Sequence, residues 1–197
     1  MIFPKVVRRE DGSLSIESLF PLHVAALVEV PELLSKPEGE ARRRLFPEPS
    51  NDEKQKAEWE RLVRPELFAL LASAREILLR DLRGIEPAEP LGAVPRWNVT
   101  IPAQHVNAWI SALNAARLAL AAQHGIESEE DLHPKLEEKD GRIELDERMF
   151  AAIKIDVLAD LQAALIFDGL PEGERPPRRE EEGPGEEGGS SDLPAPP

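Results

Sequence analysis

The sequence predicts a mainly α-helical fold: an orthogonal or up-down bundle of four to five helices with a small N-terminal β-hairpin and a disordered C-terminal tail. Three observations lead to this prediction. Leucine and alanine dominate the hydrophobic residues, while tyrosine is absent and aromatic residues make up only 5%, a mixture that favours helix over sheet. Several long segments repeat apolar residues at the helical spacing. The last residues are rich in Pro, Gly, Glu and Ser, which cannot form an apolar face.

The chain divides into one expected helical domain over residues 1–168 and an acidic tail over residues 169–197. The formal net charge is −14. Residues 171–197 carry eight acidic residues against three arginines, a charge of −5, which leaves −9 on residues 1–170. The expected folded part is therefore itself acidic.

The N-terminal hairpin is expected over about residues 2–16. Asp11-Gly12 lies between two short β-prone runs, and both residues readily adopt the positive φ angles of a tight hairpin turn. Because a lone two-stranded ribbon is marginally stable in water, this hairpin should lie against the helices.

A first helix is predicted over residues 22–34, with Pro21 suited to its first turn. Pro31 removes a backbone hydrogen bond and clashes with the preceding turn, so we expect a kink or an end near Glu29. A short helix is predicted over residues 40–45.

A third helix is predicted from the capping-box spacing of Ser50 and Glu53 to about Val63. We expect its Trp59 and Leu62 to face the core.

Pro65 begins a further helix that ends before Gly84. Its apolar residues keep the 3.6-residue period throughout: Leu67, Leu70, Leu71, Ala74, Ile77, Leu78 and Leu82.

Prolines and a glycine predict a loop over residues 85–99, with a short extended piece over 97–101. The next helix should run over residues 102–124 and end at Gly125. This helix is apolar around much of its circumference, which is typical of the centre of a bundle.

Residues 127–143 are polar, and Asp140-Gly141 predicts a turn within them. A last helix is expected over residues 145–167.

Motifs for catalysis and metal binding are missing from the sequence. The chain has no cysteine, and its four histidines show no compact metal-ligand spacing. There is no glycine-rich phosphate loop and no nucleophile elbow. We therefore expect no metal and no cofactor, and we favour a non-enzymatic role, with catalysis left open.

Two polar residues, Asn114 and Arg117, share one face of the apolar helix 102–124. Because burying an unpaired guanidinium is prohibitive, Arg117 needs either a carboxylate partner or an exit to water. The plausible partners are Asp156, Asp160 and Glu66. We favour a structural strut. The alternative is a pocket that binds an anion or a peptide terminus.

Charge and hydropathy limit the partners. An acidic surface repels a phosphate backbone, so nucleic acid is not expected as a partner. Arg42-Arg43-Arg44 is the densest basic cluster, and such a run more often forms a solvated helix face than a binding site. No apolar run approaches a membrane span or a signal peptide, so no membrane association and a cytoplasmic location are expected.

One string of residues carries a resemblance to a known family. The string is Trp109-x-x-Ala112-Leu113-Asn114-x-x-Arg117-Leu118, followed by Gly125-Ile126. Arg43-Arg44-Leu45-Phe46-Pro47 and Glu58-Trp59-Glu60-Arg61-Leu62 precede it in the same order as in that family. Over residues 1–167 the chain resembles the actinobacterial family known as domain of unknown function 2017.

The chain departs from the family pattern at two places. The family has an acid where this chain has Ala115, and an arginine often precedes the segment that here reads Gln123-His124-Gly125-Ile126. Any role that this acid and this arginine have in relatives is therefore not carried over.

The resemblance implies no biochemical activity. It implies a setting near the adaptor that feeds N-degron substrates to the Clp protease, and some members of the family are labelled transcriptional regulators.

The expected function is a non-catalytic helical interaction or regulatory module, linked through the resemblance to Clp-dependent proteolysis, with a protein as its partner. One alternative is a small-molecule or anion binder, or an enzyme, that uses Arg117. A second alternative, a transcriptional regulator, is disfavoured by the net charge. The oligomeric state is not readable from the sequence. The candidate binding residues are Asn114, Arg117, Trp109, Arg43 and Arg44.

Overall fold

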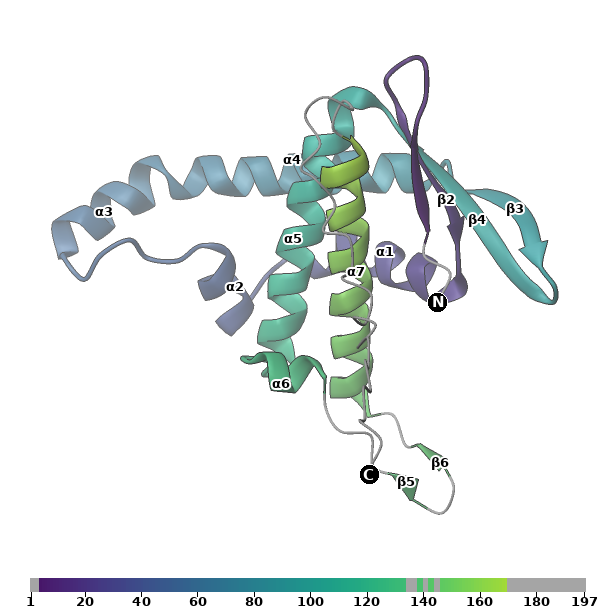
Figure 1. The fold of residues 1–197 in the computed structure, drawn as a ribbon. Helices are drawn as coiled ribbons and strands as arrows, with labels where there is room; N and C mark the ends of the chain where they lie inside the picture. The colour runs from purple at the N-terminus through teal and green to yellow at the C-terminus, as the bar shows by residue number, and fades with distance from the viewer. Residues whose placement is uncertain (1–3, 134–137, 140–141, 144–145, 170–197) are drawn as a thin grey trace, which may run out of the picture.

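The structure is a computed structural model that describes residues 4–133, 138–139, 142–143 and 146–169. It is mainly helical, with an antiparallel sheet at one end of the helices (Figure 1). The strands are β1 (Lys5–Arg8), β2 (Leu14–Leu19), β3 (Glu86–Leu91), β4 (Val94–Ile101), β5 (Glu138–Lys139) and β6 (Arg142–Ile143). The helices are α1 (Pro21–Leu33), α2 (Gly39–Leu45), α3 (Glu53–Leu62), α4 (Arg64–Leu82), the 3-10 turn η1 (Ala103–His105), α5 (Val106–Gln123), α6 (Glu129–Leu132) and α7 (Glu147–Gly169).

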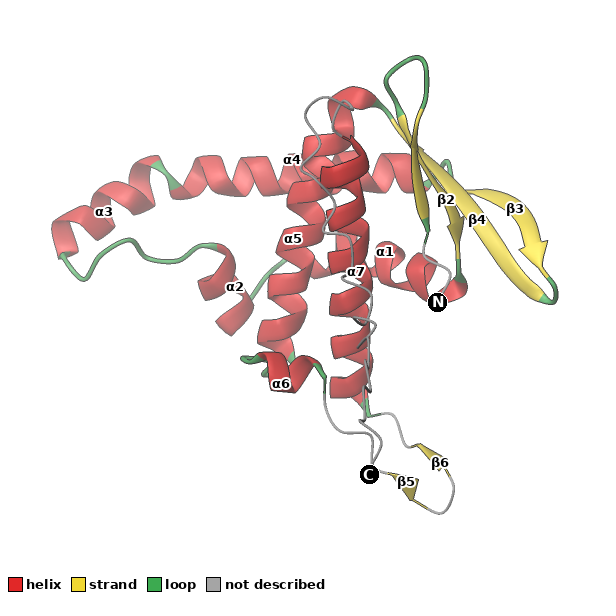
Figure 2. Cartoon of the chain, in the orientation of Figure 1, coloured by secondary structure: helices red, strands yellow, loops and turns green. Residues whose placement is uncertain are grey.

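The predicted hairpin is present, but it belongs to a larger sheet. Strands β1 and β2 pair antiparallel around the turn at Asp11-Gly12, where Gly12 has a φ of +79°. Strand β2 also pairs with β4, which pairs with β3, so the order is β1-β2-β4-β3 (Figure 2). The prediction of a helical bundle with only a hairpin is therefore wrong in its account of the strands.

The prediction of a loop over residues 85–99 is wrong because its prolines lie where a strand tolerates them. Pro87 and Pro90 are in β3, an edge strand whose outer N–H groups have no strand to bond. Pro95 lies in the part of β4 before Trp97, and the pairing of β4 with β2 begins only at Trp97. Prolines on such an edge also hinder pairing with another chain.

Helix α1 continues past Glu29 and includes Pro31 in its last turn, so of the two expectations, a kink or an end near Glu29, the end is wrong. A proline so close to the C-terminus disturbs little of the helix that follows it. The carbonyl oxygen of Pro31 accepts a hydrogen bond of 2.8 Å from Nε of Arg75, which ties the end of α1 to α4.

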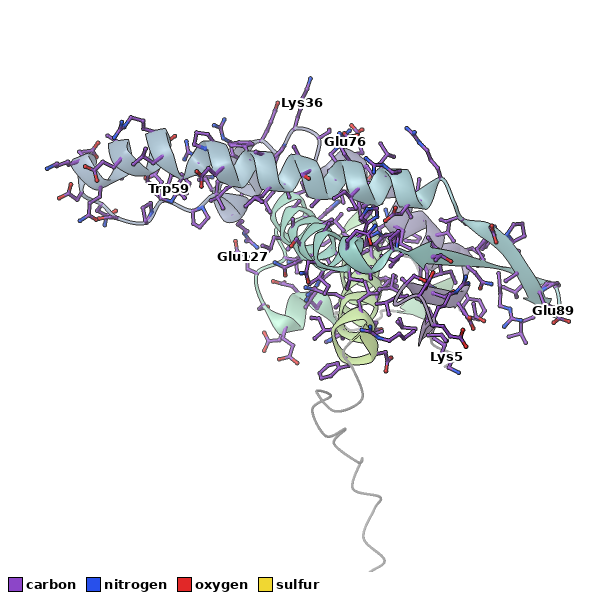
Figure 3. All side chains as sticks on the ribbon, turned by 90° about the horizontal axis from the view of Figure 1, so that it is seen from above. Lys5, Lys36, Trp59, Glu76, Glu89 and Glu127 are labelled. Atoms are coloured by element: carbon purple, nitrogen blue, oxygen red, sulfur yellow. The ribbon has the colours of Figure 1, made fainter. Side chains whose placement is uncertain are left out.

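Helices α3 and α4 follow one another almost without a break and form an arm that extends away from the other helices (Figure 1). The cap of α3 is Asp52, whose carboxylate accepts bonds from two backbone N–H groups, so the expected capping box of Ser50 and Glu53 is wrong. No residue of α3 is buried. Its side chains point outward in all directions in Figure 3, and the expectation that Trp59 and Leu62 face the core is therefore also wrong.

Helix α5 is the centre of the helical part, as its composition predicts. It contacts α1, α2, α4 and α7, and its buried residues include Trp109, Leu113 and Leu120. Gly125, with a φ of +61°, ends it as expected.

In the C-terminal half of the chain the predicted long helix is present, but the segment before that helix differs from the prediction. Helix α7 packs along α5 and lies within two residues of its expected bounds. The polar segment after α5 contains the short helix α6, which the sequence analysis missed. The expected turn at Asp140-Gly141 and the tail from residue 170 lie outside the described residues.

A buried carboxylate joins the end of α4 to the start of α5. The indole Nε1 of Trp109, which is fully buried, donates a 2.8 Å hydrogen bond to Oδ2 of Asp81. Nδ1 of His105 lies 3.0 Å from both oxygens of the same carboxylate. The Asp81 side chain is only 6% exposed, so these contacts replace most of its water.

We predict that Trp109→Ala lowers the free energy of unfolding by about 3–5 kcal/mol, because it leaves a large cavity in the core. Trp109→Phe should cost about 1–3 kcal/mol, mainly through the lost donor to Asp81. Urea unfolding followed by circular dichroism measures both values. A loss below about 1 kcal/mol for Trp109→Ala would contradict the central position of this side chain.

Candidate functional site

The largest of the cavities described here is an open apolar groove between α2, α4 and α5, with a volume of about 530 Å³. Its apolar walls include Leu67, Leu70, Leu71 and Leu118, and Phe46 also lines it. We call this cavity the leucine groove. Leu70 is 67% exposed and Leu118 is 37% exposed, so the groove presents leucine side chains directly to solvent.

The α5 wall of the leucine groove also carries polar side chains. Asn107, Ser111 and Asn114 follow one another at intervals of four and three residues, so they form one line along the helix. Each can donate and accept hydrogen bonds. The groove therefore combines an apolar floor with a polar edge, which is the usual composition of a recognition site.

A second cavity, of about 340 Å³, lies between α5, α6 and α7 and has Arg117 in its wall. We call it the Arg117 cavity. Asn114 and Leu118 line both this cavity and the leucine groove. The structure thus places the predicted pair Asn114 and Arg117 together, with Asn114 exposed and Arg117 half-buried.

The hydrogen-bond partner of Arg117 is an amide and not a carboxylate, so of the two expectations the structure supports the exit to water, since the side chain is only half-buried. Its Nη1 donates a 2.8 Å hydrogen bond to Oε1 of Gln162 on α7. The Nε2 of Gln162 in turn donates to the carbonyl oxygen of Ile110 at 3.4 Å. Partial exposure of Arg117 explains why no carboxylate is needed, since water solvates part of the charge. Its Nε is buried and has no hydrogen-bond partner among the described residues.

A carboxyl group close to Arg117 has a perturbed pKa. Burial raises the pKa of Asp156 above its usual value, and the negative charge of Asp160 adds to this effect. The positive charges of His133, at 3.6 Å, and of Arg117 oppose it. The side chain is still 43% exposed, so the charged form is disfavoured only in part.

Helix α6 forms one side of the Arg117 cavity and is fixed by a capping box. Asp131 accepts bonds from the backbone N–H groups of Glu127 and Ser128, and these bonds lower the pKa of its carboxyl group. Arg148 at the start of α7 donates to the same carboxylate and to the carbonyl oxygen of Gly125. These contacts hold α6 against α5 and α7.

The two arginines predicted as binding residues lie on α2 and have different surroundings. Arg44 donates a 3.2 Å hydrogen bond to the carbonyl oxygen of Ile126 and pairs with Glu40 and Glu127. It therefore links α2 to the turn after α5. Arg43 is 76% exposed and pairs with Glu40 at 2.6 Å.

A third cavity, of about 390 Å³, contains Arg43. We call it the arginine pocket, and its residues are Arg42, Arg43, Phe46, Pro47, Glu48 and Arg64. Phe46 also lines the leucine groove, so the pocket and the groove are neighbours.

Some residues of these sites had no clear signal in the sequence. Trp109, predicted as a binding residue, is instead a core residue joined to Asp81. Neither the contact of Asp81 with Trp109 nor that of Gln162 with Arg117 has a sequence signature. For the leucine groove the sequence gives only the apolar stripe of α4, which does not distinguish a covered helix face from an exposed one; the structure buries only Ala74 and Leu78 of it.

Other kinds of site receive no support from the described residues. None of the groups of histidine, aspartate and glutamate in residues 4–133 and 146–169 is arranged to hold a metal ion. Within the same ranges, every helix is too short or too polar to cross a membrane.

We predict that the free energy of unfolding of Asp156→Asn, relative to that of the wild type, is higher at neutral pH than at acidic pH. Because burial raises the folded-state pKa of Asp156, the folded protein holds this proton more tightly than the unfolded chain does. Wild-type stability from this group therefore falls as the pH rises through the raised pKa. Asparagine does not titrate, so the stability difference between variant and wild type should grow from pH 4 to pH 7. Urea unfolding at several pH values tests this, with the exposed Glu58→Gln as control. A difference that is constant or shrinks with pH would contradict it.

Comparison with known proteins identifies the family of the chain but no biochemical activity. No curated protein and no solved structure matches the chain significantly. The sequence model of one family, described as a domain of unknown function (DUF2017), matches residues 16–167. The match covers most of the chain and includes α1 to α5 and nearly all of α7. The chain therefore belongs to the DUF2017 family, as the residue pattern around Asn114 and Arg117 suggested.

Proposed function

We propose that this protein is a non-catalytic interaction module that binds an amphipathic helix of a partner protein in the leucine groove. The observation that supports this most directly is the exposure of Leu70 and Leu118 in an open apolar cavity of about 530 Å³. Leaving a leucine side chain in water forgoes about 1.5–3 kcal/mol of burial free energy. A partner that covers the groove would recover much of it.

The geometry of the groove favours a helix as the ligand. The walls are themselves helices, and the leucines of α4 recur at helical spacing, so an apolar helix face can pack between them. Asn107, Ser111 and Asn114 would then contact the polar border of that helix. No group in this groove is suited to act as an acid, base or nucleophile in a typical activated arrangement, which favours binding over catalysis.

The link to Clp-dependent proteolysis and the cytoplasmic location remain part of this proposal. Under it, a Clp subunit or adaptor should be among the proteins that depend on the leucine groove for capture. Nucleic acid is not proposed as a partner, because the net charge of −14 opposes it. A role in transcription would on this view act through a protein contact.

We predict that Leu70→Lys abolishes partner binding and leaves the fold intact, because this side chain is 67% exposed. Affinity capture from the source cell with quantitative mass spectrometry, followed by reconstitution with the purified partner, measures the loss. Leu91→Lys is the matched control, since Leu91 is also exposed but lies on β3. Equal capture by the wild type and both variants would contradict the proposal.

A second candidate function, the binding of a small anion by Arg117, is favoured by one observation. The direct hydrogen-bond partner of the guanidinium is the neutral Gln162, and the Arg117 cavity lies beside it. A carboxylate or phosphate group in this cavity would supply the missing negative charge. The raised pKa of Asp156 marks the same neighbourhood as electrostatically perturbed.

We predict for this candidate that phosphate or citrate raises the melting temperature of the wild type but not that of Arg117→Met. Differential scanning fluorimetry at constant ionic strength measures the shift, because ligand binding to the folded state stabilises it. Arg83→Met removes an exposed arginine at the end of α4 and serves as the control. The same shift in all three proteins would assign it to general salt effects and reject the site.

A further inference from the structure

The arginine pocket is a cationic site in an acidic protein. Its arginines come from α2 and from the first residue of α4, and they surround a cavity of about 390 Å³ next to Phe46. The protein as a whole has a formal charge of −14. A concentration of guanidinium groups on such a background attracts anionic groups locally and can bind carboxylates in a bidentate manner.

The positive charge of the pocket is only partly neutralised by its neighbours. Arg43 pairs with Glu40, and Arg64 pairs with Glu60. Glu48, which also lines the pocket, pairs with Lys56 at 3.2 Å and so does not neutralise Arg42. Arg42 has no carboxylate within ion-pair distance among the residues that the structure describes, and lies 5.7 Å from the ring centre of Phe68.

Arg64 adds an unsatisfied donor to this excess of positive charge. Its guanidinium carbon lies 4.8 Å from the ring centre of Trp59, and its buried Nε has no hydrogen-bond partner in the part of the chain that the structure describes. A buried N–H without an acceptor costs free energy that a carboxylate oxygen could recover.

The chain carries an anionic segment that can reach this pocket. Residues 170–197 follow α7 and contain Glu180-Glu181-Glu182 and Glu186-Glu187. The end of α7 lies beside Leu14 and Val106, at the N-terminal end of α5. Arg44 is bonded to Ile126, beyond the other end of α5.

The distance between these two ends suits the length of the segment. Helix α5 has 18 residues and is therefore about 27 Å long. Glu180 follows Gly169 by eleven residues, which extend over at most about 36–40 Å. The glutamates that follow Glu180 have still more chain available to reach α2.

We propose that the acidic segment around residues 180–187 binds intramolecularly in the arginine pocket, with its carboxylates on Arg42, Arg43 and Arg64. The segment would then lie beside Phe46, at the end of the leucine groove. The inference goes beyond the proposed function, because its test measures a contact within the chain and no partner protein.

The test uses the full chain with a nitroxide label in the acidic segment. The protein has no cysteine, so Ser190→Cys gives a single labelling site. At about 0.1 M salt, backbone amide signals of residues 42–46 should broaden, while those of residues 88–92 should not. At about 1 M salt the broadening should disappear, because the Debye length falls from about 10 Å to about 3 Å.

Charge variants of the labelled chain identify the two contact surfaces. Arg42→Gln with Arg43→Gln should remove the broadening, and so should replacing the five glutamates of 180–182 and 186–187 by glutamine. Arg80→Gln with Arg83→Gln, which removes two exposed charges from the far end of α4, should leave it unchanged. Circular dichroism checks that each variant is folded. The proposal is overturned if no broadening is observed at low salt. It is also overturned if the broadening persists after the two arginines, or the five glutamates, are replaced by glutamine.

Discussion

The buried carboxylate of Asp81 is the contact on which the arrangement of the helices depends. It accepts the indole hydrogen bond of Trp109 and contacts the imidazole of His105, so it joins the end of α4 to the first turns of α5. Strand β4 enters α5 through η1, and therefore the same contact fixes the sheet relative to the helices. Since the Asp81 side chain is only 6% exposed, losing either contact would leave part of the hydrogen-bonding capacity of its carboxylate unsatisfied.

The fixed end of α4 explains why the rest of that helix is exposed. Near Asp81, α4 packs on α5 and buries Leu78 and Ala74. Toward its N-terminus α4 extends past the core and continues into α3 (Figure 1). Among the described residues, the leucines on this outer part are only partly covered by α5 and the α2 region, and Leu70 remains 67% exposed. The leucine groove is thus a consequence of where α4 is anchored and how long it is.

Structural features that depend on residues close together in the sequence were predicted correctly. Features that depend on contacts between residues far apart in the sequence were not. Helical periodicity located α5 and α7, and Asp11-Gly12 located the first hairpin. Apolar residues on a helix do not reveal whether another part of the same chain packs on them. For this reason the expectation that Trp59 faces the core is wrong. Prolines exclude a central strand but not an edge strand, so β3 was missed. Arg117 does not bond to a carboxylate, because it is partly exposed to water and donates a hydrogen bond to Gln162.

The three cavities are neighbours, because the leucine groove shares lining residues with each of the other two. Phe46 belongs to the arginine pocket and to the leucine groove, while Asn114 and Leu118 belong to the leucine groove and to the Arg117 cavity. The leucine groove therefore has an arginine-containing cavity as a neighbour through Phe46 and another through Asn114 and Leu118. A ligand that moved one of these shared side chains would alter a wall of the leucine groove, and by reciprocity an occupant of the groove would then alter the affinity for that ligand.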